Sequence, residues 1–178
     1  RRFNLPFRSG GSLCGSKLPD AQAAYETTHT LNAALLGGVN FMLHACGWLE
    51  GGLVSSFEKF VLDADQLGVL HHLARGVSIT ENDQALDAIH EVGPGGHYLG
   101  CAHTQANFKE AFWRTEVLDY KPFETWEEEG AKDSMNLAAL RVEQMLANYQ
   151  KPTLSPDISE ALDAYIANKK SSMPDSFL

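Results

Sequence analysis

The sequence has few basic residues and few cysteines, and it contains no long apolar run. Its 14 lysines and arginines stand against 23 aspartates and glutamates, which gives a formal net charge of −9. Binding to nucleic acid or to an anionic membrane requires clustered Lys and Arg, so this balance argues against both partners. No apolar stretch approaches the roughly 18 residues of a membrane span.

The three cysteines, Cys14, Cys46 and Cys101, are odd in number and scattered, which excludes a disulfide framework. This usage favours a reducing compartment, and we expect the protein to be cytoplasmic. With 178 residues and 44% hydrophobic content, the chain can form one domain with a real core. Because it runs from Arg1 directly into a strand-like segment, we expect it to be the C-terminal part of a larger protein.

The first 121 residues alternate apolar segments with amphipathic helical patterns. Strands are predicted at 3–9, 39–46 and 97–102, and a helix follows each of them. Such alternation favours parallel strands joined by helical crossovers, in either a small open sheet or the closing portion of an eight-stranded barrel. Residues 122–178 change character and are predicted to be helical.

Local signals mark the ends of several helices. Pairs with capping-box spacing are Ser55 with Glu58 and Thr125 with Glu128. Thr80 and Asp83 are predicted to start a further short helix. The helix from about 56 to 74 has an apolar stripe made by Phe57, Phe60, Val61, Ala64 and Leu67. Pro19 and Ser155-Pro156 are predicted to start helices, and Gly37-Gly38 and Gly76 are predicted to end them.

The segment from Asn40 to Glu58 is the most informative part of the chain. Open α/β sheets and β/α barrels hold their sites at the C-terminal ends of strands, so the loop carrying His44, Trp48 and Glu50 is the candidate site. A lone His in an apolar strand is more often a core residue than a ligand. Near the end of its strand, however, His44 can face a pocket and hydrogen-bond a substrate.

A mirrored pair of motifs raises the alternative of a zinc site. His44-Ala-Cys46 and Cys101-Ala-His103 each place two ligand types on one side of a predicted strand. If the two strands were adjacent, the four side chains would suit a Cys₂His₂ site. Small buried cysteines are common in strands, so no metal site is predicted.

Seven ordered blocks, spread over nearly the whole chain, carry a family resemblance. They are Ser16-Lys-Leu-Pro-Asp-Ala-Gln-Ala-Ala-Tyr-Glu26, Gly47-Trp-Leu-Glu-Gly-Gly-Leu53, Glu58-Lys-Phe-Val-Leu-Asp-Ala-Asp65, Glu91-Val-Gly-Pro-Gly-Gly-His97, Ala102-His-Thr104, Phe112-Trp-Arg114, and Trp126-Glu-Glu with Gly130-Ala-Lys-Asp133. Together these blocks resemble the trimethylamine methyltransferase family.

The resemblance implies an α/β fold, with residues 1–121 forming βα units from the C-terminal portion of a (β/α)₈ TIM-type barrel. Residues 122–178 would be a helical C-terminal extension of the same domain. The implied activity moves a methyl group from a quaternary or tertiary methylamine, such as glycine betaine or trimethylamine, to the Co(I) of a corrinoid (cobalamin) carried by a partner protein. Some members contain pyrrolysine, and the absence of any non-standard residue here favours the glycine-betaine-type branch.

The implied chemistry gives roles to four residues of the candidate site. Co(I) supplies the nucleophile and the amine leaves neutral, so the protein positions the cation and no catalytic residue is assigned. Aromatic faces attract quaternary ammonium groups by ~0.5–2 kcal/mol each, which makes Trp48 and Phe41 candidates for substrate binding. Glu50 could supply a countercharge and His44 a hydrogen bond. Alternatively, Trp48 plugs the barrel mouth and Glu50 caps a backbone amide.

Other residues could face the pocket or the corrinoid. Gly10 and Gly11 either form a turn or let backbone amides approach an anion. His97, His103 and Thr104 flank the third predicted strand. The alternative role of Thr104 is to cap the helix that follows.

Two interpretations of the function remain, an enzyme and a non-catalytic binding or scaffold module built from the same half-barrel. We expect the isolated chain to be inactive, because most strands of a barrel lie outside it. We also expect it to form a homo-oligomer, because open strand edges and apolar faces would otherwise be exposed to water.

Overall fold

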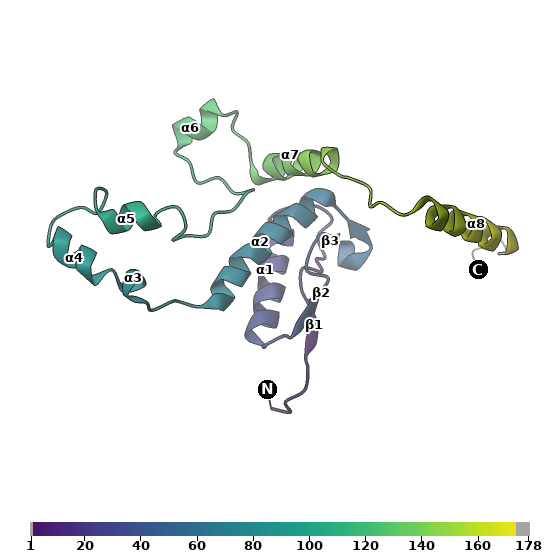
Figure 1. The fold of residues 1–178 in the computed structure, drawn as a ribbon, viewed down its shortest axis with the longest axis horizontal. Helices are drawn as coiled ribbons and strands as arrows, with labels where there is room; N and C mark the ends of the chain where they lie inside the picture. Colours follow the sequence, from purple (N-terminus) through teal and green to yellow (C-terminus); the bar gives the residue numbers. More distant parts are fainter. Residues whose placement is uncertain (1, 174–178) are drawn as a thin grey trace. The chain divides into compact units, whose positions relative to one another are not determined.

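The computed structural model describes residues 2–173. The chain divides into two compact units, Arg1–Gln144 and Met145–Leu178. Figure 1 labels the helices and strands of both units.

The first unit opens with a parallel βαβ arrangement. Strand β1 (Arg8–Gly10) pairs with β2 (Phe41–Leu43) in parallel, with Ser9 opposite Met42, and α1 (Ala21–Leu36) connects them. A small antiparallel pair follows, in which β3 (Trp48–Leu49) and β4 (Val54–Ser55) flank the 3₁₀ turn η1 (Glu50–Gly52). The parallel crossover is confirmed, although β1 and β2 are each shorter than predicted.

Helix α1 follows its local signals closely. The Asp20 side chain accepts a hydrogen bond from the N–H of Ala23 and caps the helix, and Gly37 ends it. The buried positions recur every three or four residues and form one stripe: Ala23, Thr27, Leu31 and Ala34.

Helix α2 (Phe57–Arg75) has the predicted length but buries a different face. Ser56, not Ser55, is its N-cap, with its side chain accepting the N–H of Lys59. The buried residues are Lys59, Asp63 and Leu70, whereas Phe57 is 67% exposed and Phe60 is 51% exposed. The predicted apolar stripe is therefore wrong as a core face, because α1 presents polar Thr27 to Lys59.

The predicted strand at 97–102 is absent from the described residues. Three short helices, α3 (Glu81–Gln84), α4 (Leu86–Val92) and α5 (Ala102–Asn107), occupy this region. Thr80 and Asp83 start α3 as predicted, and they do so by forming a capping box. Tyr98 to Cys101 closes as a turn, since the N–H of Cys101 donates to the carbonyl of Tyr98, and no strand pairs with this segment.

Three helices complete the chain. Helix α6 (Phe123–Glu128) begins after Pro122, so Thr125 lies inside it and the predicted capping box there is wrong. Helix α7 (Ser134–Ala147) follows, and helix α8 (Pro156–Ser172, with Ser155 as N-cap) starts where it was predicted. None of the helices in residues 2–173 combines the length and apolar character that crossing a bilayer requires.

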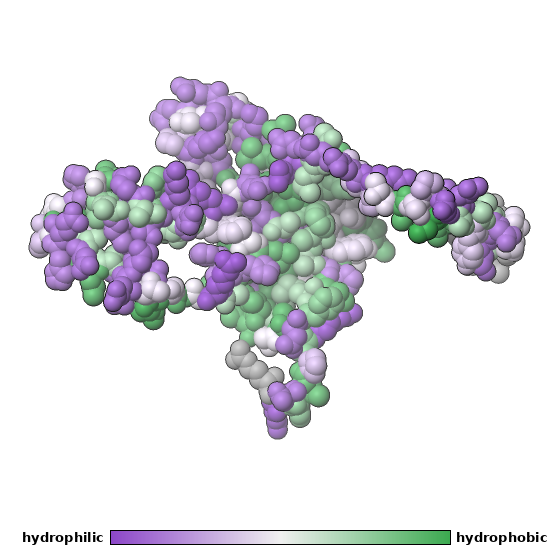
Figure 2. Space-filling view, in the orientation of Figure 1, coloured by the Kyte–Doolittle hydropathy of each residue, from purple (hydrophilic) through white to green (hydrophobic). Residues whose placement is uncertain are grey.

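Many large apolar side chains are exposed on the described residues. Figure 2 shows hydrophobic surface over the central region that contains α1, α2 and the strands. Phe41 of β2 is 63% exposed, and Leu53 at the end of η1 is 84% exposed. Contiguous apolar surface of this kind usually marks an interface, which makes these elements candidates for burial against further protein.

Candidate functional site at the ends of the parallel strands

The ends of β1 and β2 bring together two predicted site residues, Gly10 and His44. His44 directly follows β2, and a methyl group added to Gly10, the last residue of β1, would lie 3.9 Å from its Cδ2 atom. The His44 and Trp48 rings meet edge to face, with centroids 5.9 Å apart. Trp48 also forms a parallel bridge with Leu13, so the loops that follow the two strands run side by side.

His44 is not the strand residue that the sequence predicted. It lies beyond β2, is exposed, and adopts a left-handed conformation with φ 55°. Ser12 (φ 56°) and Glu50 (φ 51°), which come from the same pair of loops, share this conformation. Left-handed backbone costs a non-glycine residue roughly 1–3 kcal/mol and is concentrated at functional sites.

Glu50 is held by its backbone and presents a free carboxylate. Its N–H donates to the carbonyl of Ser16 at 2.8 Å, and the next amide, of Gly51, donates to the carbonyl of Cys14 at 2.7 Å. Within residues 2–173 the exposed Glu50 side chain accepts no hydrogen bond, so it does not cap a neighbouring amide there. An indole, an imidazole and a carboxylate thus come from one short segment.

The remaining predicted residues lie elsewhere. Phe41 opens β2 opposite Arg8, at the other end of the strand from His44. His103 contacts α3 through its Nε2 atom, which is 2.6 Å from the carbonyl of Asn82. Thr104 lies inside α5, and its carbonyl accepts the N–H of Phe108, while His97 lies in the turn region after α4.

The arrangement considered for zinc depended on the missing strand. Cys101 is the N-cap of α5 and not a strand residue, so the mirrored motifs do not share neighbouring strands. Burial, with a smaller contribution from the negative charge of Asp63, raises the pKa of the Cys46 thiol to about 11. Zinc binds the thiolate, which this environment disfavours. The described residues contain no group of three side chains placed to hold a metal ion.

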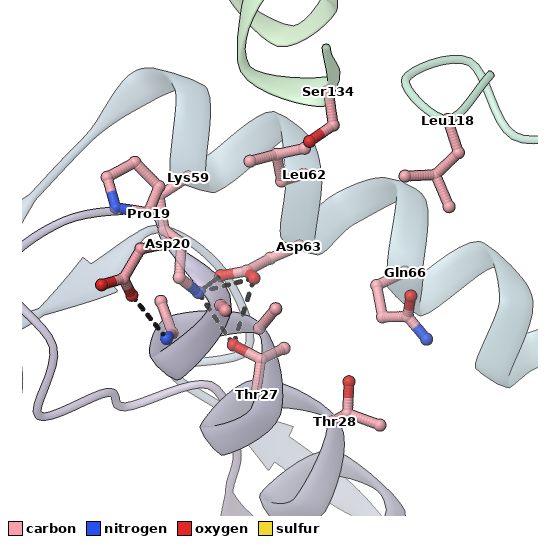
Figure 3. A pocket seen from close by; sticks show the side chains of 13 residues that line it. Pro19, Asp20, Thr27, Thr28, Lys59, Leu62, Asp63, Gln66, Leu118 and Ser134 are labelled. Carbon is pink, nitrogen blue, oxygen red and sulfur yellow. Dashed lines mark hydrogen bonds and ion pairs between the residues drawn. The ribbon is translucent and has the colours of Figure 1, made fainter.

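A buried polar cluster lies directly behind the loop and was not predicted. We call Ser12, Thr27, Lys59 and Asp63 the buried cluster; Lys59 is 2% exposed and Asp63 is 3% exposed. The Lys59 ammonium donates to Thr27 Oγ1 at 2.8 Å and to both Asp63 oxygens (Figure 3). It also donates to Ser12 Oγ at 3.1 Å. One loop and two helices therefore meet at this ion pair.

The buried cluster forms part of the wall of a cavity of about 320 Å³ between α1 and α2. Figure 3 shows Thr28 and Gln66 along the helices, with Leu118 and Ser134 on the opposite side. Small residues of α1, Ala21, Ala23 and Ala24, leave this space open.

One sequence signal pointed toward the buried cluster. Lys59 and Asp63 are four residues apart in a helix, the spacing of an ion pair on one face. Such pairs are nearly always solvated, since Lys and Asp are rarely buried. Their burial depends on Thr27 and Ser12, which are distant in sequence.

Gly11 has a packing role that a substitution can test. A methyl group added to Gly11 would lie 2.3 Å from Cδ2 of fully buried Leu31, whereas one added to Gly10 would meet nothing closer than 3.5 Å. We expect Gly11→Ala in the complete protein to lower the free energy of unfolding by about 1–3 kcal/mol through overpacking. Urea unfolding, with Gly10→Ala as the matched control, measures the difference; equal midpoints for the two variants would contradict this role.

Together, the fold and the loop place the candidate site at the ends of two parallel strands. The sequence matches the family model described as trimethylamine methyltransferase (MTTB) over residues 1–174, and the chain belongs to this family.

Known relatives agree with this assignment. The chain is 43% identical over 169 residues to the glycine betaine methyltransferase of Desulfitobacterium hafniense strain Y51, covering 95% of this chain and 35% of that protein. It is 32% identical over 171 residues to the proline betaine:corrinoid methyltransferase of Eubacterium limosum (93% and 35%). It is 30% identical over 164 residues to a trimethylamine methyltransferase of Methanosarcina barkeri (92% and 33%). The chain thus spans about a third of the length of these relatives.

Proposed function

We propose that this chain forms part of an enzyme that transfers a methyl group from a quaternary or tertiary methylamine to the Co(I) of a corrinoid protein. The observation that carries the proposal is its 43% identity, over 95% of its length, to a glycine betaine methyltransferase. Glycine betaine is therefore the first substrate to test. The corrinoid, carried by the partner protein, supplies the nucleophile that accepts the methyl group.

The loop after β2 has groups that suit a betaine. The face of a half-exposed indole attracts a quaternary ammonium cation, and Trp48 is such an indole. The exposed Glu50 carboxylate adds a countercharge, and the exposed His44 imidazole beside Trp48 can donate a hydrogen bond to a substrate carboxylate. The chain's contribution is to hold the methyl group in line with its acceptor and to exclude water.

The proposal extends to fold and assembly. One parallel βαβ crossover supports the interpretation that residues 1–121 belong to a (β/α)₈ barrel, with residues 122–178 as its helical extension. The exposed apolar side chains of β2, η1 and α2 support burial against further protein, including a second copy in a homo-oligomer. Three free cysteines fit a reducing location such as the cytoplasm.

The reaction can be followed in the visible spectrum. We expect the complete protein that the gene encodes, mixed with reduced cobalamin and glycine betaine, to convert Co(I) to methyl-Co(III). Trimethylamine, without pyrrolysine, should react poorly. No spectral change with glycine betaine, other betaines, choline, carnitine or trimethylamine would overturn the enzymatic proposal and favour a scaffold. Omitting the protein, with all other components present, is the control.

A further inference from the structure

Gly47 lies between His44 and Trp48, and both of its backbone polar groups form hydrogen bonds with the N-terminal half of α2 or its N-cap residue. Its N–H donates to Asp63 Oδ2 at 2.9 Å, and its carbonyl accepts the N–H of Ser56 at 3.1 Å. Gly47 is buried with φ +83°, and a methyl group added there would lie 3.2 Å from Cβ of Phe60. This close approach requires glycine and leaves the peptide little freedom.

The same carboxylate also holds the loop that follows β1. Ser12 Oγ donates to Asp63 Oδ2 at 2.5 Å, and the N–H of Ser12 donates to Thr30 Oγ1 at 3.0 Å. One buried side chain of α2 therefore ties the loop after β1 to the loop that carries the candidate site. Lys59 balances the charge that this carboxylate would otherwise bury alone.

Packing alone does not account for an ion pair in this position. Replacing a buried pair by apolar side chains of similar volume is often neutral or stabilising, since the desolvation of two charges offsets much of their attraction. Apolar side chains would fill the space between α1 and α2, but they would leave the N–H of Gly47 without an acceptor. The Asp63 carboxylate thus supplies the hydrogen-bond acceptor that the N–H of Gly47 requires.

We propose that Asp63 is a positioning residue, whose carboxylate fixes the Gly47 peptide and thereby orients His44 and Trp48 toward the quaternary ammonium substrate. Lys59 acts through Asp63 by pairing with its charge and holding the carboxylate in place. The identity of the ligand rests on the proposed function above, whereas the anchoring of the loop does not.

Two double variants of the complete protein separate positioning from packing. Lys59→Met with Asp63→Asn removes both charges but keeps a carbonyl oxygen that can accept the N–H of Gly47. Lys59→Met with Asp63→Leu removes both charges and the acceptor, with a similar side-chain shape. An exposed ion pair provides the control, Lys121→Met with Glu129→Leu.

Hydrogen exchange of the peptide covering residues 44–53 and the KM for glycine betaine are the two measurements. We expect the leucine variant to exchange about 10-fold faster and to raise KM about 10-fold, the usual size of effects from groups that orient a site. The asparagine variant should stay within about 3-fold of the wild type on both measurements, because the acceptor is retained. The exposed control should change neither.

Equal exchange rates and equal KM values in the asparagine and leucine variants would overturn the proposal and leave Asp63 a packing role. If the wild type converts no amine, the proposed function fails. Hydrogen exchange then decides by itself whether Asp63 anchors the loop. Faster exchange in the leucine variant only would still establish the anchor, whereas equal exchange in both variants would refute it.

Discussion

Replacing Lys59 with methionine is expected to lower the free energy of unfolding of the complete protein by about 3–5 kcal/mol, because it leaves a buried carboxylate without its cation. Asp63 is 3% exposed, and the Lys59 ammonium lies 2.5 Å from its Oδ2 atom. Thr27 and Ser12 also lose the ammonium that donates to them. Urea unfolding monitored by circular dichroism measures the change.

Two further variants show whether the loss comes from the unpaired charge. Adding Asp63→Leu to Lys59→Met should restore most of the stability, because no charge then remains buried. Lys121→Met, which breaks exposed ion pairs with Asp119 and Glu129, should cost less than about 1 kcal/mol. If Lys59→Met costs no more than Lys121→Met, the buried pair does not stabilise the fold.

Replacing Trp48 with alanine is expected to weaken the binding of a quaternary amine by about 1–2 kcal/mol, since the indole face attracts the cation. That loss corresponds to roughly a 5- to 30-fold rise in Kd. Trp48 is only half-buried, and within residues 2–173 its ring pairs with no aromatic ring other than His44, so its removal should disturb the core little. Calorimetric titration of the complete protein with glycine betaine measures the affinity.

The control for this change is a second tryptophan outside the candidate site. Trp113 lies against Gly68 of α2 and is 46% exposed, so Trp113→Ala should leave the affinity for the amine unchanged. Trp48→Phe should retain part of the affinity, because a smaller aromatic face remains. An unchanged Kd for Trp48→Ala together with a lowered melting temperature would remove Trp48 from the site.

Several helix ends were predicted correctly, because their signals act over a few residues. Gly37 and Gly76 end α1 and α2, the capping box of Thr80 and Asp83 starts α3, and Ser155-Pro156 starts α8. The prediction of a strand at 97–102 was wrong because a strand, unlike a helix end, depends on residues that are distant in sequence. A strand needs a partner for its backbone groups, and no element of the described chain pairs with this segment, so the backbone closes into a turn instead.

The sequence by itself determined the family, several helix ends and the segment that carries His44, Trp48 and Glu50, because blocks of residues and helix-end signals are local properties of the chain. Only the tertiary structure showed that His44 lies beyond its strand against Trp48, and that α2 buries Lys59 and Asp63. Charged residues one helical turn apart are normally solvated. Burial becomes favourable here because Ser12, Thr27 and Gly47, which are distant in sequence, bring the hydrogen bonds that replace water around the two charges.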